Sequence, residues 1–197
     1  ESAMDQEASA RRLTLALAGR AYNVAPHLAA QAKLEKAWLL VDVGGGTGLY
    51  SFALLQRFPQ LRVVIFDRPE VLKVAEELAA AQGVADRVEL QPGDMFADPI
   101  PAADAILLSN ILHDWDEPQC LRLIERCAAA LPADGQLLIH DVLLDDALDG
   151  PLPIALYSAA LFTLTEGRAY SAAEYRSWCA TAGMTIETCL PTLAHCW

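Results

Sequence analysis

The sequence predicts an α/β fold built on a doubly wound, mostly parallel sheet. Short apolar runs typical of buried strands alternate with segments that carry the apolar spacing of helices. The first apolar run leads into a glycine-rich turn, as at the ligand-binding edge of such sheets. A length of 197 residues suits one domain, and an apolar fraction of 54% is enough for a sizeable core.

The expected elements follow one another along the whole chain. Strands are expected at residues 38–43, 61–67, 88–92, 104–108, 136–141 and 184–189. Helices are expected at residues 8–18, 51–58, 71–82, 117–131, 154–165 and 172–182. Pro69 suits the first turn of the third helix, and Pro59 and Pro132 lie just beyond the ends of two others.

The glycine-rich turn follows the first strand. Gly44 and Gly46 lack a Cβ atom, so backbone amides at these positions can come close to a ligand. Asp42, inside the end of the strand, can accept hydrogen bonds from a cationic amine. A nicotinamide-binding turn would have its third glycine at the position of Leu49, one residue after Gly48. The turn alone is compatible with a dinucleotide or with an adenosyl cofactor.

Two further strand ends carry carboxylates. The second strand ends in Asp67, which can accept hydrogen bonds from both ribose hydroxyls, although a helix cap is the alternative. The third strand runs into Gly93, Asp94 and Met95. There a carboxylate facing an adenine amino group and an apolar side chain against the ring would form an adenosine pocket, although Gly-Asp is also a common turn.

The fourth strand ends close to a histidine. His113 lies just beyond the carboxyl end of this strand, at the edge where open α/β sheets bind ligands. A lone histidine is more often structural than catalytic, but this position favours a functional one. Ser109 and Asn110 come directly before it and are candidates for contact with a cofactor.

In combination these segments resemble the small-molecule O-methyltransferases of the plant caffeate/flavonoid and animal hydroxyindole type. The shared motifs are DVGGGTG (42–48), FDRPEV (66–71), GDMF (93–96) and LHDWDEPQC (112–120), within a resemblance over about residues 36–190. The resemblance implies the Rossmann-like sheet of S-adenosylmethionine (SAM) methyltransferases, with the final strand cut short. It also implies SAM as cofactor, bound by Asp42, Gly44, Gly46, Asp67, Gly93, Asp94 and Met95. Ser109 and Asn110 stand where the family has basic or aromatic residues and remain candidates for contact with the cofactor.

By the same resemblance, the reaction is methyl transfer to a hydroxyl of a small aromatic or polyketide-like acceptor. His113 is then the general base, and Asp141, at the end of the fifth strand, orients its imidazole. The family's second glutamate is replaced by Ala169, and Glu166 should point elsewhere. This departure leaves two alternatives open: C-methylation or a hydroxylase-like reaction on the same fold, or a non-catalytic SAM-binding module.

The resemblance also implies an acceptor pocket and a second domain. The helix at 154–165 lines the acceptor pocket in the family, through Tyr157, Leu161 and Phe162, with core packing as the alternative. Met4 matches a methionine that borders the acceptor. Residues 1–34 are expected to be linker helices from a missing N-terminal dimerisation domain, and residues 35–197 to be the SAM-binding catalytic domain. A homodimer through the missing domain follows, and the family's last strand would begin near residue 194.

Composition excludes several classes of function. A net charge of −12 without a basic stripe disfavours nucleic-acid binding. The 5 cysteines form neither a CxxC pair nor a metal-binding pattern, which favours reduced thiols and a cytoplasmic protein without a metal site. We find no signal peptide and no apolar run long enough to cross a membrane.

Overall fold

The computed structural model describes residues 7–193 and 195–197. Met4, expected near the acceptor, lies outside the described residues, as does residue 194, near which a last strand was expected. No helix in the described part of the chain is both long and apolar enough to cross a membrane.

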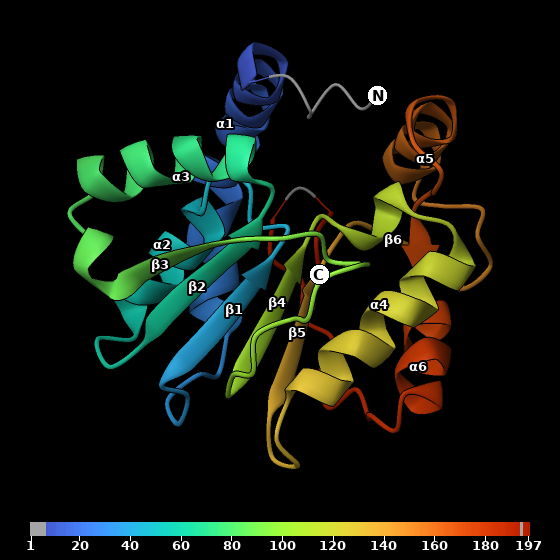
Figure 1. Ribbon diagram of the computed structural model, residues 1–197. Coiled ribbons are helices and arrows are strands. Elements are labelled where there is room, and N and C mark those ends of the chain that lie inside the picture. Colours follow the sequence, from blue (N-terminus) through green and yellow to red (C-terminus); the bar gives the residue numbers. More distant parts are fainter. Residues whose placement is uncertain (1–6, 194) are drawn as a thin grey trace.

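A five-stranded sheet forms the centre of the molecule, and every neighbouring pair in it is parallel (Figure 1). Its strands lie in the order β3 (Val88–Pro92), β2 (Arg62–Asp67), β1 (Leu39–Val43), β4 (Ala105–Ser109) and β5 (Gln136–His140). The order reverses between β1 and β4, and ligands bind beyond the carboxyl ends of the strands at such a switch point. The doubly wound α/β fold is thereby confirmed.

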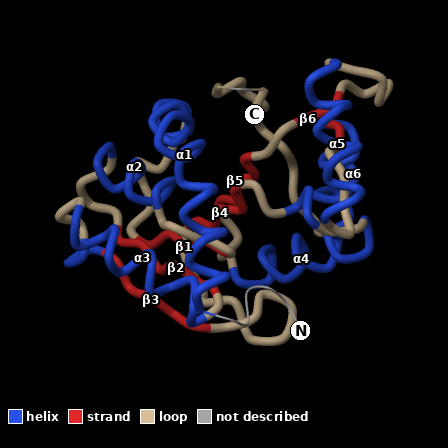
Figure 2. The backbone as a smooth tube through the Cα atoms, turned by 90° about the horizontal axis from the view of Figure 1, so that it is seen from above, coloured by secondary structure: helices blue, strands red, loops and turns tan. Residues whose placement is uncertain are grey.

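Helices cover both faces of this sheet (Figures 1 and 2). The first face carries α1 (Glu7–Gln31), α2 (Leu49–Arg57) and α3 (Pro69–Ala81), and the second carries α4 (Glu117–Ala130) and α6 (Ala172–Thr181). Strand side chains alternate between the two layers, so that Leu40 packs with the first set and Val41 with the second. Among the described residues, 3-10 turns are η2 (Ala85–Arg87), before β3, and η3 (Leu112–Asp114), before α4.

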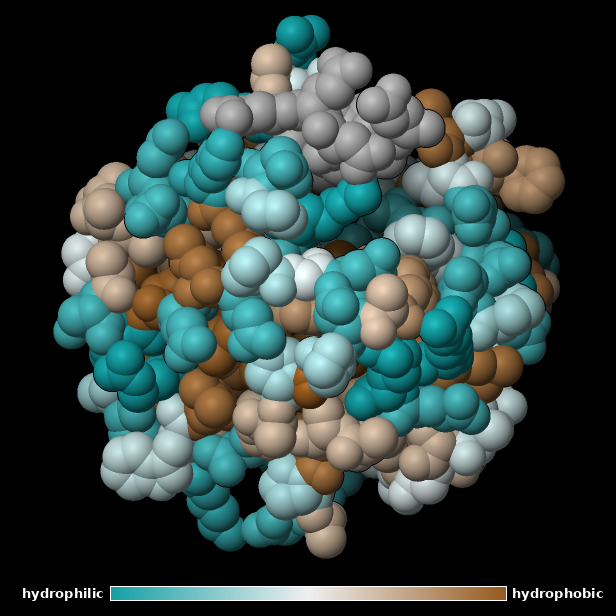
Figure 3. Space-filling view, viewed as in Figure 1, coloured by the Kyte–Doolittle hydropathy of each residue, from teal (hydrophilic) through white to brown (hydrophobic). Residues whose placement is uncertain are grey.

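The helix α5 (Leu152–Leu164) stands apart from both layers, beyond the carboxyl ends of the strands (Figure 1). It is apolar nearly all round, yet only Ile154 and Leu161 are buried. Hydrophilic residues cover much of the face in Figure 3, whereas apolar residues protrude at its upper right, where α5 lies. Leu164 is 81% exposed and Phe162 77% exposed.

The first helix is longer than the sequence predicted. The expected helix at 8–18 continues to Gln31 and contains Pro26. A proline inside a helix removes one backbone hydrogen bond and strains the preceding turn. Packing of Ala18, Ala21 and Leu28 against the layer formed with α2 and α3 outweighs this penalty.

The prediction of a sixth strand at 184–189 is wrong. These residues form no strand, because a groove of about 510 Å³ separates them from β5 and leaves them without a partner. The last described residues pair with the chain beyond β5 instead: Asp141 N donates to Trp197 O at 3.2 Å, and Trp197 N donates to Asp141 O at 2.9 Å. A short parallel pair of strands, β6 (Leu143–Leu144) and β7 (Tyr170–Ser171), was not predicted from the sequence.

Candidate active site

The glycine turn between β1 and α2 adopts a conformation that other residues would strain. Gly44 and Gly46 have positive φ angles of 68° and 58°. At Gly45 an added Cβ would lie 2.7 Å from the carboxyl carbon of Asp42. The turn therefore packs directly over Asp42, whereas at Gly46 an added Cβ would meet no atom nearer than 3.9 Å and a ligand can come close to the backbone.

Asp42 is a buried carboxylate with one unpartnered oxygen. Its side chain accepts a hydrogen bond from Ser51 Oγ at 2.6 Å through Oδ2, whereas Oδ1 is buried without a partner. Burial raises the pKa of Asp42 to about 7. Because an unpaired buried oxygen is costly, a cationic donor such as an amine would be bound well here.

Asp67, at the end of β2, holds the glycine turn in place. Its Oδ2 accepts from Gly46 N at 2.8 Å, and its Oδ1 accepts from Arg68 N at 2.7 Å. Burial raises the pKa of this carboxyl, and both backbone donors oppose the rise. Asp67 makes no capping bond to α3, whose N-cap residue is Arg68. A ligand hydroxyl would therefore meet a carboxylate already fixed in direction.

The segment after β3 forms a turn next to Asp67. Asp94 is exposed, and its Oδ1 accepts from Phe96 N at 2.7 Å. The turn given as the alternative for Gly-Asp is thus present. Gly93 packs tightly against Phe66, since an added Cβ would lie 2.3 Å from that ring. Met95 is partly buried against the second core layer.

Ser109 and Asn110 belong to a polar network at the end of β4. Asn110 has a positive φ of 56°, its Nδ2 donates to Tyr50 OH at 3.2 Å, and its Oδ1 is buried without a partner. Ser109 Oγ lies 2.9 Å from Nδ1 of His140. Burial lowers the pKa of His140 to about 4, so this imidazole is neutral near pH 7.

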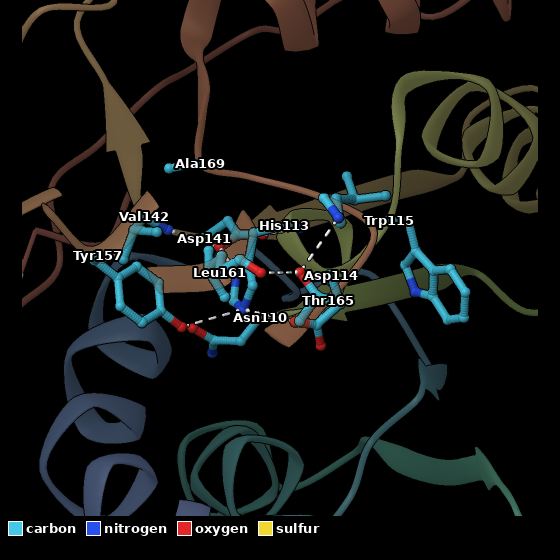
Figure 4. Close-up of polar contacts among 12 residues, drawn as sticks. Asn110, His113, Asp114, Trp115, Asp141, Val142, Tyr157, Leu161, Thr165 and Ala169 are labelled. Carbon is cyan, nitrogen blue, oxygen red and sulfur yellow. Dashed lines mark hydrogen bonds and ion pairs between the residues drawn. The ribbon is translucent and has the colours of Figure 1, made fainter. Parts of the chain in front are cut away.

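His113 is buried in η3 and held by Asp141 (Figure 4). The His113 Nδ1 atom lies 2.5 Å from Asp141 Oδ1. Asp141 also accepts hydrogen bonds from His113 N at 3.3 Å, from Val142 N at 2.8 Å and from Tyr175 OH at 3.4 Å. With the Nδ1 proton directed at Asp141, Nε2 is the nitrogen left to accept a proton.

The charge of Asp141 also changes the basicity of His113. Burial by itself lowers the pKa of His113, but the carboxylate of Asp141 opposes it and leaves the pKa above its ordinary value. The positive imidazolium form is therefore stabilised inside a buried site. This is the electrostatic arrangement that a general base needs.

Two groups lie on the Nε2 side of the ring. Tyr157 OH is 3.4 Å from Nε2 and Asp114 Oδ1 is 3.6 Å from it. Ala169 is buried in an apolar cluster and brings no acid (Figure 4), and Glu166 is exposed. Tyr157 lies on the helix that the resemblance expects beside the acceptor, but no local pattern predicts its contact with the imidazole, because 44 positions separate the two residues in the chain.

Tertiary structure thus gathers nearly all predicted site residues at the carboxyl edge of the sheet. Hydrogen bonds or direct packing join Asp42, Asp67 and Gly93 to the glycine turn and its strands, and a second network joins Ser109, Asn110, His113 and Asp141 to neighbouring side chains. Asp94 is the most exposed of them, in a turn at the margin. Within residues 7–193 and 195–197, no cluster of three or more His, Cys, Asp or Glu side chains could hold a metal ion.

Comparison with known sequences relates residues 3–185 to the O-methyltransferase domain. The chain is 42% identical, over 160 residues, to a 3-hydroxy-5-methyl-1-naphthoate 3-O-methyltransferase from Streptomyces sahachiroi, covering 81% of this chain and 46% of that protein. It is 36% identical, over 154 residues, to acetylserotonin O-methyltransferase from Bos taurus, covering 78% of this chain and 44% of that one. The chain thus spans about half the length of these curated relatives.

Solved structures of methyltransferases are also similar to this chain. An O-methyltransferase family 2 protein from Planctomyces limnophilus, in complex with apigenin, superposes with a TM-score of 0.93 at 57% identity. That match covers 95% of this chain and 60% of the other. Human N-acetylserotonin methyltransferase in complex with SAM superposes with a TM-score of 0.85 at 29% identity, covering 91% of this chain and 51% of that one.

Proposed function

Because this chain belongs to the O-methyltransferase domain family, we propose that the whole protein transfers a methyl group from SAM to a hydroxyl of a small aromatic or polyketide-like acceptor. One observation carries the proposal: His113 is buried, bonded to Asp141 through Nδ1, and left with Nε2 as a proton acceptor. The names of the relatives, which act on a naphthoate and on acetylserotonin, support an aromatic acceptor.

The residues at the carboxyl edge fit the cofactor. The unpartnered Oδ1 of Asp42 suits the amine of its methionyl end, and the space at Gly46 would let the cofactor come close to the backbone. Asp67 would bind the ribose, and Gly93, Asp94 and Met95 would border the adenine. Gly44, Gly46, Ser109 and Asn110 would complete the cofactor site. When bound, SAM supplies an electrophilic methyl group on a positively charged sulfur.

The role of His113 is to take one proton. Its Nε2 accepts the proton of the acceptor hydroxyl, and Asp141 stabilises the resulting imidazolium through the Nδ1–H bond. The rest of the site aligns two reactants and excludes water, which contributes through proximity and desolvation. Neutral to mildly basic pH keeps the imidazole unprotonated and therefore active.

The replacement at Ala169 supports a second candidate function. With an apolar cluster where the family has an acid, His113 has one carboxylate on its Nδ1 side. An enzyme of this fold that performs C-methylation or a hydroxylase-like reaction would need less help from its base. The geometry of His113 and Asp141 argues against a non-catalytic SAM-binding module.

We also propose that residues 1–34, whose helix α1 packs on the catalytic unit of residues 35–197, connect that unit to a dimerisation domain in the whole protein. The bare apolar surface of α5 supports this, since large exposed apolar patches mark interaction surfaces. A homodimer through that domain would cover α5 and close the acceptor side. Sedimentation of the whole protein at several concentrations tests it, and a monomer throughout would contradict it.

The central test is mass spectrometry of products formed from methyl-labelled SAM and a panel of phenols and hydroxylated polyketides, with the whole protein. The substitution His113→Gln should lower kcat by roughly 10²–10⁴-fold, as for other general bases. Affinity for S-adenosylhomocysteine should not change. The matched control is His27→Gln, on the exposed side of α1. Near-normal turnover in His113→Gln would favour the second candidate function.

A further inference from the structure

Arg20 is a cationic residue of α1 at the margin of the active site that the mechanism above does not use. Its Nη2 donates to Cys196 Sγ at 2.7 Å. Cys196 forms an antiparallel bridge with Val142, the residue after Asp141. The guanidinium is therefore held beside the chain segment that orients the base.

Arg20 has no carboxylate partner among the described residues. Arg11, on the same helix, forms two bonds of 2.8 Å to Glu77, whereas Arg20 takes part in no ion pair there. A guanidinium offers five N–H donors, and a neutral thiol satisfies few of them. Because a partly buried cation without an anion is costly, this arrangement suits a site that binds one.

Two phenols extend the site from Arg20 towards His113. The hydroxyl of Tyr157 lies 3.4 Å from His113 Nε2, and the hydroxyl of Tyr50 accepts from Asn110 Nδ2 at 3.2 Å. Burial raises the pKa of both tyrosines, and the positive charge of Arg20 opposes the rise in each. The Tyr157 phenol therefore lies near both the guanidinium and the base.

We propose that Arg20, assisted by the hydroxyl of Tyr157, binds a carboxylate of a ligand in this active site. The inference deepens the proposed methyl transfer and rests on it. Two sources have this chemistry: a carboxylate on the acceptor, or the α-carboxylate at the methionyl end of the cofactor. The contact of Tyr157 with Nε2 favours the acceptor, because one aromatic ring system could then present its hydroxyl to His113 and its carboxylate to Arg20.

The test compares two pairs of ligands on the whole protein. The first pair is an accepted hydroxyaryl carboxylate and its carboxamide, compared by kcat/KM. The second pair is S-adenosylhomocysteine and 5′-methylthioadenosine, which lacks the amino-acid end, compared by calorimetric Kd. The variants are Arg20→Met, Arg20→Lys to restore the charge, and Arg12→Met as an exposed control on the same helix.

We expect Arg20→Met to lower kcat/KM for the carboxylate by roughly 10- to 100-fold, the range for a lost bond to a charged group. The carboxamide should change little, and Arg20→Lys should recover part of the loss. If Arg20→Met weakens binding of S-adenosylhomocysteine but not of 5′-methylthioadenosine, and leaves both acceptors unaffected, the carboxylate site belongs to the cofactor. If the variant changes both members of each pair by the same factor, the proposal is overturned.

Measurements on the wild-type protein distinguish failure of this inference from failure of the proposed function. If wild type transfers methyl groups and Arg20→Met shows no selective loss for the carboxylate ligand, only the carboxylate site is contradicted. Wild type that neither binds S-adenosylhomocysteine nor methylates an acceptor contradicts the function. Should Arg20→Met fail to fold, as thermal unfolding would show, Arg20→Gln and Tyr157→Phe replace it in the same two comparisons, and unchanged ratios in both variants overturn the proposal.

Discussion

Replacing Asp141 by asparagine removes the charge that stabilises protonated His113 while nearly keeping the shape of the side chain. The bond between Asp141 Oδ1 and Nδ1 is 2.5 Å long, and both residues are buried, so solvent screens the interaction little. A hydrogen bond to a charged group contributes about 1.5–3 kcal/mol. If that energy is available when the imidazolium forms, Asp141→Asn should lower kcat by roughly 10- to 100-fold.

The same substitution should shift the pH dependence of the enzyme. Burial lowers the pKa of His113 and Asp141 raises it, so without the charge the pKa falls. The base then stays unprotonated to lower pH, and the acidic limb of the kcat/KM profile moves to lower pH while the plateau drops. Methyl transfer from labelled SAM, measured from about pH 5 to 9, gives both quantities.

The substitution Asp141→Asn should also lower the free energy of unfolding. If its amide oxygen takes the place of Oδ1, its NH2 group faces the backbone N–H of His113, which then loses its acceptor. An unsatisfied buried donor costs about 1–3 kcal/mol of unfolding free energy. Asp134→Asn, at an exposed position, is the matched control. An unchanged plateau and an unmoved acidic limb would refute the assigned role of Asp141.

Three further predictions concern the cofactor side. Asp67→Ala should weaken S-adenosylhomocysteine binding by about 1.5–3 kcal/mol, measured by calorimetry, whereas exposed Glu76→Ala should not; equal affinities would leave Asp67 only as a support of the turn. Burial raises the pKa of Asp42 to about 7, and the amine of bound S-adenosylhomocysteine would lower it, so binding of this ligand at pH 6 should release protons. Identical binding heats in buffers of different ionisation enthalpy would contradict this. Gly93→Ala should cost about 1–3 kcal/mol in urea unfolding because its Cβ would overlap an aromatic ring; Gly19→Ala meets nothing within 4 Å, and a similar loss there would disprove the packing argument.

Local patterns were enough to predict most of the fold. Each of the five sheet strands lies within about a residue of its expected position. Four of them contain apolar runs with clear ends, and β3 alternates apolar with polar residues. The family resemblance is confirmed as well. The predictions were wrong where contacts with a distant part of the chain determine the secondary structure. Packing against α2 and α3 keeps α1 helical on both sides of Pro26. Residues 184–189 form no strand because no neighbouring strand pairs with them.

The site was predictable only in part for the same reason. His113 and Asp141 both follow strand ends, and parallel strands bring such ends together. Their mutual contact therefore follows from topology. The resemblance placed Tyr157 on the helix expected beside the acceptor, but it did not predict the contact with the base. Arg20 lies on a helix whose orientation depends on tertiary packing, so nothing in its sequence surroundings predicts its place beside residue 196.

The position of Asp141 just beyond β5 has a consequence for thermal inactivation. On its outer side this strand borders a groove rather than another strand, and most of its residues are only partly buried. Edge elements of this kind open locally at lower free energy than the whole domain unfolds. Fraying of β5 would release the imidazole from its acid while the layers around β1 and β2 stay folded. Loss of turnover on heating should therefore precede loss of helical signal.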